Sequence, residues 1–287
     1  MDSLELLAEL IAIPGPPGEE QWVAEAVARH LDRMRLPYDV DAKGNVLVGN
    51  NVDPAVVVTA HLDEIALMVR AVYSDGTLAV APLGGLLAGK IGEGPVLILA
   101  DEAPLEGALS FGSVHSTIRP ETTWDGARII TGRPAHQLLD MGVRPGTRVT
   151  IHPSRRTLQP IGDLVAGHFL DDRADLVAWL LALEELKQEP MSFLFAATTS
   201  EEVGGEGALY LMNRVQPDVC IALELGPNAP DSPVEISVNP TVWVKDSYAS
   251  MSAEDGRLLT RVGHDLDLAL QFQMLSSGGS DASCAAS

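Results

Sequence analysis

Two continuous apolar runs constrain the fold of this chain more than any other feature. They are AVVVTA at residues 55–60 and SFLFAAT at residues 192–198, and neither alternates polar with apolar side chains. Such runs are expected of strands that are covered on both faces, as in a parallel or mixed sheet with helices on each side. The sequence therefore predicts an α/β fold in which a mixed sheet is the middle of three layers.

Helical periodicity places further elements around these strands. Apolar residues recur at helical spacing in residues 19–34, and residues 174–187 are also predicted to be a helix. The alternation of helices with strands along the chain supports the α/β assignment. The remaining predictions are helices at 3–11, 207–213 and 253–269, and strands at 38–41, 45–48, 219–223 and 271–275.

The composition changes between the two halves of this α/β pattern. From Val69 to Pro160, short alternating runs are separated by Gly, Pro and Asp, with little helical periodicity. Long loops would give the same composition, but a structureless span of this length is uncommon in a compact protein. We therefore predict that residues 67–162 form an inserted β-rich, barrel-like domain. Residues 1–66 and 163–287 then form the two parts of the α/β domain.

Charge and cysteine content narrow the partners and the compartment. Asp and Glu outnumber Lys and Arg by 40 to 19, and the formal net charge of -21 repels the phosphates of nucleic acids. The N-terminal residues have no basic region, and no run approaches the ~20 apolar residues that cross a bilayer. We therefore expect neither a signal peptide nor a membrane anchor. Two cysteines are too few for a disulfide framework, so a cytoplasmic location is expected.

Four segments place acidic residues or histidine directly after predicted strands or in a turn. They are TAHLDE (59–64), FLDDR (169–173), TTSEEVG (198–204) and ALELGP (222–227). Each has an ordinary explanation alone, such as a polar turn or a helix N-terminus. Together they favour a metal site, because carboxylates gathered at strand ends repel each other unless cations neutralise them. A ligand set of His, Asp and Glu without thiolates suits zinc, cobalt or manganese.

These motifs, with the later Gly278-Gly279-Ser280-Asp281-Ala282, resemble the tetrahedral (TET) aminopeptidases, the glutamyl aminopeptidase group of peptidase family M42. The likeness covers nearly the whole chain, and its most specific part is His-x-Asp-Glu at 61–64 with Glu-Glu-Val-Gly at 201–204. It implies a metal-dependent aminopeptidase that releases N-terminal residues from short peptides. It also implies two divalent metal ions, with zinc or cobalt favoured and manganese as the alternative.

The resemblance implies a metal-binding role for four residues in the α/β domain, which becomes the catalytic domain. His61 would bind one metal ion, and Asp171 would bridge the two ions. Glu202 would bind the second ion, which is the one that His61 does not bind. Glu224 would complete the site around the ion that His61 binds.

Two further acidic residues would act without binding metal. Asp63 would orient the ring of His61, as carboxylates behind metal ligands do. Glu201 would be the general base for a metal-bound water, which is the nucleophile in this mechanism. The adjacent pair Glu201 and Glu202 suits this division, because one side chain can reach the metal while the other reaches the water.

The resemblance also implies an assembly and one more ligand. In the family resembled, the inserted domain mediates dimer contacts and dimers build tetrahedral dodecamers, so we expect a homo-oligomer. Relatives carry a further His ligand tens of residues beyond the Gly-Gly-Ser-Asp-Ala segment, whereas this chain ends at Ser287, six residues after Asp281. We expect that the sequence lacks a C-terminal segment, and the alternative is a shortened, inactive relative.

Two other functions fit the same residues. One is a related two-metal dipeptidase, deacylase or carboxypeptidase, and the other is a metal-free, non-catalytic scaffold. A cysteine nucleophile is not expected, because Cys220 lies in an apolar strand without a nearby histidine. The other histidines, including His168, are interpreted as surface or packing residues.

Overall fold

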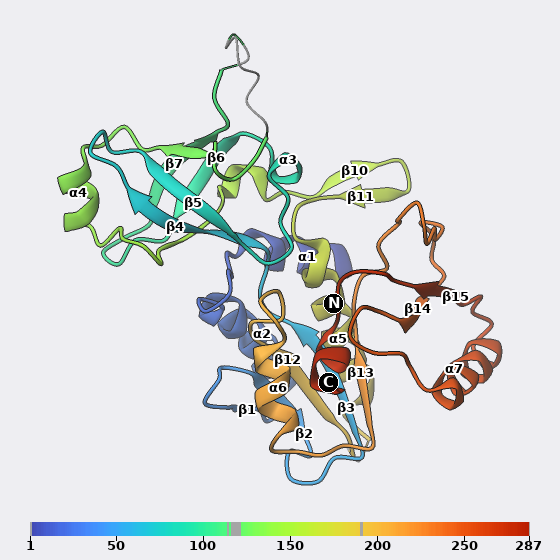
Figure 1. Cartoon of the computed structure of the whole chain (residues 1–287). Helices are drawn as coiled ribbons and strands as arrows, with labels where there is room; N and C mark the ends of the chain where they lie inside the picture. The colour runs from blue at the N-terminus through green and yellow to red at the C-terminus, as the bar shows by residue number, and fades with distance from the viewer. Residues whose placement is uncertain (1, 114, 116–121, 190–191, 287) are drawn as a thin grey trace. The chain divides into compact units, whose positions relative to one another are not determined.

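A computed structural model describes residues 2–113, 115, 122–189 and 192–286 of the chain (Figure 1). The chain forms two compact units. The first comprises Met1–Arg29 and Leu62–Arg173, and the second comprises His30–His61 and Ala174–Ser287. The chain passes from one unit to the other within helix α2 (Gln21–Met34), after His61, and near the start of helix α5 (Leu170–Leu186).

The second unit contains a five-stranded mixed sheet with the strand order β1-β2-β12-β3-β13. Strand β3 lies between β12 and β13 and pairs with both in parallel, whereas β12 pairs antiparallel with β2. The two continuous apolar runs are therefore strands of the sheet, as predicted, and the structure shows that they are neighbours. The strands are β1 (Asp39–Val40), β2 (Val46–Gly49), β3 (Val56–His61), β12 (Leu194–Thr198) and β13 (Val219–Ala222).

Helices cover both faces of this sheet. Phe195 of β12 packs edge-on against Trp179 of α5, with the ring centroids 5.9 Å apart. Because side chains alternate along a strand, the neighbouring Ala196 faces the other way. On that face Ala196 shares a hydrophobic cluster with Leu211 of helix α6 (Glu206–Met212). The three-layer α/β arrangement that the sequence predicted is confirmed.

The C-terminal part of this unit differs from the sequence prediction by one strand that was not predicted and by the end of one helix. Strand β15 (Gln271–Met274) pairs in parallel with β14 (Thr241–Lys245) in a separate two-stranded sheet, not with the main sheet. Helix α7 (Ala253–Asp265) ends before the predicted residue 269. It ends because Asp267 adopts a left-handed φ of 56°, and the backbone N–H of Leu268 bonds back to the Gly263 carbonyl at 2.8 Å. The chain then reaches α8 (Asp281–Ala286), which packs against α6.

The first unit contains a closed barrel with the strand order β4-β5-β8-β7-β6-β9, coloured from cyan to green in Figure 1. Alternate barrel residues, such as Leu67 and Val69 or Leu78 and Val80, form one buried hydrophobic cluster. The predicted β-rich, barrel-like insertion is thereby confirmed as a fold, and its boundaries at 67 and 162 stay a prediction. The strands are β4 (Ala66–Val72), β5 (Leu78–Leu83), β6 (Gly94–Ile98), β7 (Leu105–Ser110), β8 (Arg128–Ile130) and β9 (Arg148–Ile151).

Short helices and one hairpin complete the first unit. Helix α1 begins where the Asp2 carboxylate accepts from the backbone N–H groups of Leu4 and Glu5. Among the residues that the structure describes, no helix is both long and apolar enough to cross a bilayer. The remaining elements are α1 (Ser3–Ala12), α3 (Ala88–Ile91), α4 (Ala135–Asp140), η1 (Pro153–Arg155), β10 (Gln159–Ile161) and β11 (Leu164–Ala166).

Candidate metal centre

The parallel register of β3 and β13 brings His61 and Glu224 to the same edge of the main sheet. Ala222 of β13 lies opposite Thr59 of β3, and the Leu223 N–H donates to the Thr59 carbonyl at 2.8 Å. Two residues beyond this pair, the chain reaches His61 at the end of β3 and Glu224 just after the end of β13. The sheet thus delivers an imidazole and a carboxylate side by side.

Two further carboxylates come from the start of α5. Asp171 and Asp172 have non-helical backbone angles, and the peptide bond between them is cis. Regular helix follows them, which agrees with the predicted start at residue 174. Asp172 is buried, whereas Asp171 is exposed.

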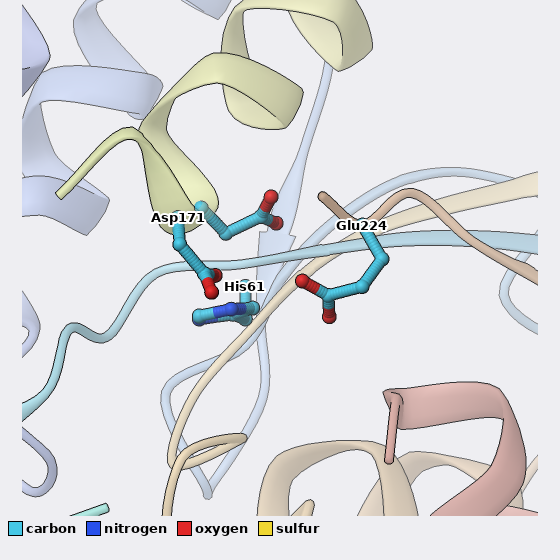
Figure 2. Close-up of side chains that lie close together, drawn as sticks. His61, Asp171 and Glu224 are labelled. Carbon is cyan, nitrogen blue, oxygen red and sulfur yellow. The ribbon is translucent and has the colours of Figure 1, made fainter. Parts of the chain in front are cut away.

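These side chains form a group that could hold a metal ion. One ligand atom from each of His61, Asp171, Asp172 and Glu224 lies within 4.8 Å of the others. Figure 2 shows the side chains of His61, Asp171 and Glu224 pointing toward a common centre. The His61 side chain is buried, with an exposed fraction of 2%, and Glu224 is half-buried. One imidazole with three carboxylates is a donor set that fits a divalent cation, so these residues fit the metal that the resemblance implies.

The structure places the other predicted site residues outside this group. Glu201 and Glu202 lie half-buried in the turn between β12 and α6, where the Glu201 carbonyl accepts from the N–H groups of Gly204 and Gly205, each at 2.9 Å. Thr198, the last residue of β12, lies opposite His61 in the parallel register, so this turn leaves the same edge of the sheet. Glu202 as a ligand and Glu201 as a base stay predictions.

Asp63 is fully buried two residues beyond His61, and its predicted role in orienting the His61 ring stays a prediction. Asp172 is the member of the group for which the sequence predicted no role. The signal that could have found it is the Asp-Asp pair itself, because either carboxylate of the pair is close enough in sequence to reach the same centre.

Neither cysteine has the properties of a nucleophile. Burial raises the pKa of the Cys220 thiol to about 12, and burial followed by the nearby Glu201 carboxylate raises the pKa of Cys284 to about 11. Both thiols are therefore protonated at neutral pH, and the thiolate is the reactive form. This agrees with the expectation that the chemistry does not use cysteine.

Comparison with known proteins gives the family. A family model described as M42 glutamyl aminopeptidase matches residues 44–287 of the chain. The chain belongs to the M42 glutamyl aminopeptidase family. A putative aminopeptidase of Acetivibrio thermocellus is 27% identical to this M42 chain, over 98% of the chain and 84% of the relative. The lysyl aminopeptidase of Pyrococcus furiosus is 28% identical over 77% of the M42 chain and 66% of the relative.

Solved structures show that the M42 chain has the fold of TET aminopeptidases. The structure of PhTET1-12s, a dodecamer in its asymmetric unit, matches with a TM-score of 0.87 at 25% identity. The match covers 100% of the M42 chain and 87% of the PhTET1-12s chain. An aminopeptidase of the archaeon Desulfurococcus kamchatkensis has a TM-score of 0.86 at 24% identity, over 98% of the M42 chain and 82% of its own. The family and the fold that the motifs predicted are confirmed, and the M42 chain is a peptidase hydrolase of an aminopeptidase family.

Proposed function

We propose that this chain is a metal-dependent aminopeptidase that releases N-terminal residues from short peptides. The observation that carries the proposal is the convergence of His61, Asp171, Asp172 and Glu224 within 4.8 Å of one another in a chain of this family. Three carboxylates gathered in this way repel each other, and a divalent cation removes that repulsion. The gathering of these acids therefore favours a metal enzyme over a metal-free scaffold.

The ligands can be divided between two ions. His61 and Glu224 would hold one ion, Asp171 would bridge to the second, and Glu202 would hold the second ion. Asp172 is available as a further oxygen donor beside Asp171. When bound, such ions lower the pKa of water and polarise the peptide carbonyl. Zinc and cobalt suit the nitrogen and oxygen donors, and manganese is the alternative.

The chain itself would supply the proton transfer and the alignment of His61. Glu201, half-buried in the turn after β12, would accept a proton on its carboxylate and deliver it to the leaving amine. Asp63, buried next to the same strand end, would accept a hydrogen bond from the His61 ring and hold its orientation. Because Glu201 and Glu202 are adjacent on one turn, Glu202 would bind the metal while Glu201 would act as the base.

The assembly and the location are also part of the proposal. A solved TET1 peptidase of Pyrococcus horikoshii can assemble into a tetrahedron or a large octahedral shell. We propose a homo-oligomer for this chain, from a dimer up to a tetrahedral dodecamer, with the barrel domain at residues 67–162 as the dimerisation domain. Peptides rather than nucleic acids are the proposed partners, because the net charge is -21. A cytoplasmic location is proposed on the low cysteine content.

Peptide hydrolysis with free and blocked N-termini tests the proposed function. The purified protein is stripped of metal with a chelator and assayed on a peptide with a free N-terminus and on its N-acetylated form, before and after cobalt or zinc is added. We expect cleavage of the free peptide alone, and only after metal is added. Cleavage of the acetylated peptide would indicate a deacylase or carboxypeptidase, and cleavage of neither peptide with either metal would favour the scaffold.

A further inference from the structure

A fully buried group of charged side chains lies within the first unit, and two of its members, Glu64 and Arg173, lie within three residues of proposed metal ligands. The side chains of Glu64, Arg156 and Arg173 have no exposed surface. Glu64 Oε2 accepts from Arg173 Nη2 at 2.9 Å and from Arg156 Nη1 at 3.2 Å, and Glu64 Oε1 pairs with Arg156 Nη2. Thr150 Oγ1 donates to Glu64 Oε1 at 2.7 Å and accepts from Arg156 Nη2 at 2.9 Å. We call Glu64, Arg156 and Arg173 the buried ion cluster.

The buried ion cluster also holds the backbone around it. Arg173 Nη1 donates to the carbonyl of Leu62, and at 3.4 Å to the carbonyl of Asp63. The Glu64 N–H donates to the Gly15 carbonyl at 3.0 Å. A side chain at Gly15 would begin 2.9 Å from Arg173 Nη2, so the backbone packs directly on the guanidinium. The segment at residues 62–64 is thus held from two sides.

A second anchor is the end of helix α1. Arg156 Nη1 donates to the Ile11 carbonyl at 2.8 Å and to the Ile13 carbonyl at 3.2 Å. The Arg156 guanidinium also lies over the ring of Phe169, 4.2 Å from its centroid. The barrel, the end of α1 and the segment that leads into α5 therefore meet at one group of charges.

This arrangement connects the cluster to the proposed metal ligands. The segment 62–64 directly follows His61, and Arg173 directly follows Asp171 and Asp172. Arg173 connects the two segments, because its guanidinium donates to the carbonyls of Leu62 and Asp63 and its own backbone directly follows Asp172. The cluster has one more positive than negative charge, and Arg173 attracts the carboxylates of Asp63 and Asp172.

Stability alone is a weak reason to bury these charges. Replacement of a buried ion group by apolar side chains is often neutral or stabilising, whereas such groups can specify one arrangement of the chain. We propose that Glu64, Arg156 and Arg173 are positioning residues that hold the segments bearing His61, Asp171 and Asp172 in the metal-binding arrangement before metal arrives. This inference rests on the proposed metal site.

Cobalt titration of variants tests the inference. Metal-stripped wild type, Glu64→Gln and Thr150→Val are titrated with Co²⁺, and the visible absorption of the bound ion reports both affinity and ligand geometry. Loss of a group that orients metal ligands lowers metal affinity by about 10- to 100-fold. We expect such a loss for Glu64→Gln with a shifted cobalt spectrum, and a smaller loss in the same direction for Thr150→Val.

Matched controls separate positioning from stability. Thr131→Val removes a hydroxyl that donates to the Gly76 carbonyl at 2.8 Å, and Glu93→Gln alters a carboxylate that accepts from Ser110 and Phe111. Both controls lie in the same unit, and we expect both to bind Co²⁺ as the wild type does even where their melting temperature falls. If Glu64→Gln fails to fold, Thr150→Val decides, because it keeps all three charges.

The outcomes distinguish this inference from the proposed function. Wild-type cobalt affinity in both Glu64→Gln and Thr150→Val overturns the positioning role and leaves the metal site standing. A wild-type protein that binds no Co²⁺ overturns the metal site and the positioning role together. The positioning role is also overturned if a control whose melting temperature falls as far as that of the variants loses the same Co²⁺ affinity.

Discussion

At the scale of single residues, Glu201 is the side chain whose replacement separates proton transfer from metal binding. It lies in the turn after β12, and the group of potential ligands found among the described residues does not contain it. A positioned general base contributes about 10²- to 10⁴-fold to the rate. We therefore expect Glu201→Gln to lower kcat by about that factor while Co²⁺ affinity stays at the wild-type value. Steady-state kinetics and cobalt titration measure the two quantities.

The matched control for this variant is Glu206→Gln. Glu206 is exposed on α6 and pairs with Lys43, and an exposed ion pair contributes about 0–1 kcal/mol to stability. This control should keep the wild-type kcat. The role of Glu201 would be contradicted by a Glu201→Gln protein that keeps its kcat, or by one that loses cobalt affinity in proportion to activity.

The residues of the site could be predicted only in part. His61, Asp171 and Glu224 were predicted as ligands and lie together in the structure. Asp172 was not predicted, because the choice between adjacent carboxylates depends on backbone angles that depart from the helix at Asp171 and Asp172. Sequence spacing carries no such angles.

At the scale of elements, the sequence located the strands of the main sheet to within two residues of their ends, whereas it did not predict the small C-terminal sheet. Strands β3 and β12 are covered on both faces and were predicted within two residues of their ends. Strand β14 was not predicted. Strand β15 was predicted, but its pairing with β14 in a separate sheet was not, because neighbours distant in sequence decide which strands pair. The short helices α3 and α4 were also missed, since four or six residues are too few to show helical periodicity.

The connection between β11 and α5 gives a prediction about pH. Burial lowers the pKa of His168, and the nearby Arg155 and Arg156 lower it further. Because the folded pKa lies below the unfolded value of about 6.5, the unfolded chain binds the proton more readily. The stability that neutral His168 allows is thus fully present above about pH 6.5 and is lost as the pH falls from there toward the folded pKa.

Replacement of His168 should remove this part of the pH dependence. We expect the free energy of unfolding to fall less in His168→Gln than in the wild type as the pH is lowered from 7 to 5. Denaturant unfolding at several pH values measures the difference. His136→Gln, at an exposed position in α4, is the control and should follow the wild-type curve. Parallel curves for His168→Gln and wild type would contradict the prediction.

At the scale of the whole molecule, family membership and fold rest on most of the chain, whereas the chemistry depends on a few residues. The family model covers residues 44–287, and the solved TET structures match both the main sheet and the barrel. The fold alone does not determine the activity, because unrelated chemistry can occupy the same architecture. In the proposed function, the gathered side chains of His61, Asp171, Asp172 and Glu224 are the step that connects this fold to peptide hydrolysis.

The proposed homo-oligomer gives a prediction for the whole molecule. The barrel unit exposes Leu87, Ile130 and Leu139, with exposed fractions of 67%, 53% and 56%. If this domain forms the dimer contact through these exposed apolar side chains, charges at these positions would be buried without partners on association, which is unfavourable. We expect the triple variant Leu87→Glu, Ile130→Glu and Leu139→Glu to have the mass of a single chain by light scattering, with an unchanged far-UV circular dichroism spectrum.

The control Val52→Glu, at a loop position that is 82% exposed outside the barrel, should keep the wild-type mass. A triple variant with the wild-type mass would place the contact on another surface, and a monomeric wild type would remove the homo-oligomer from the proposal.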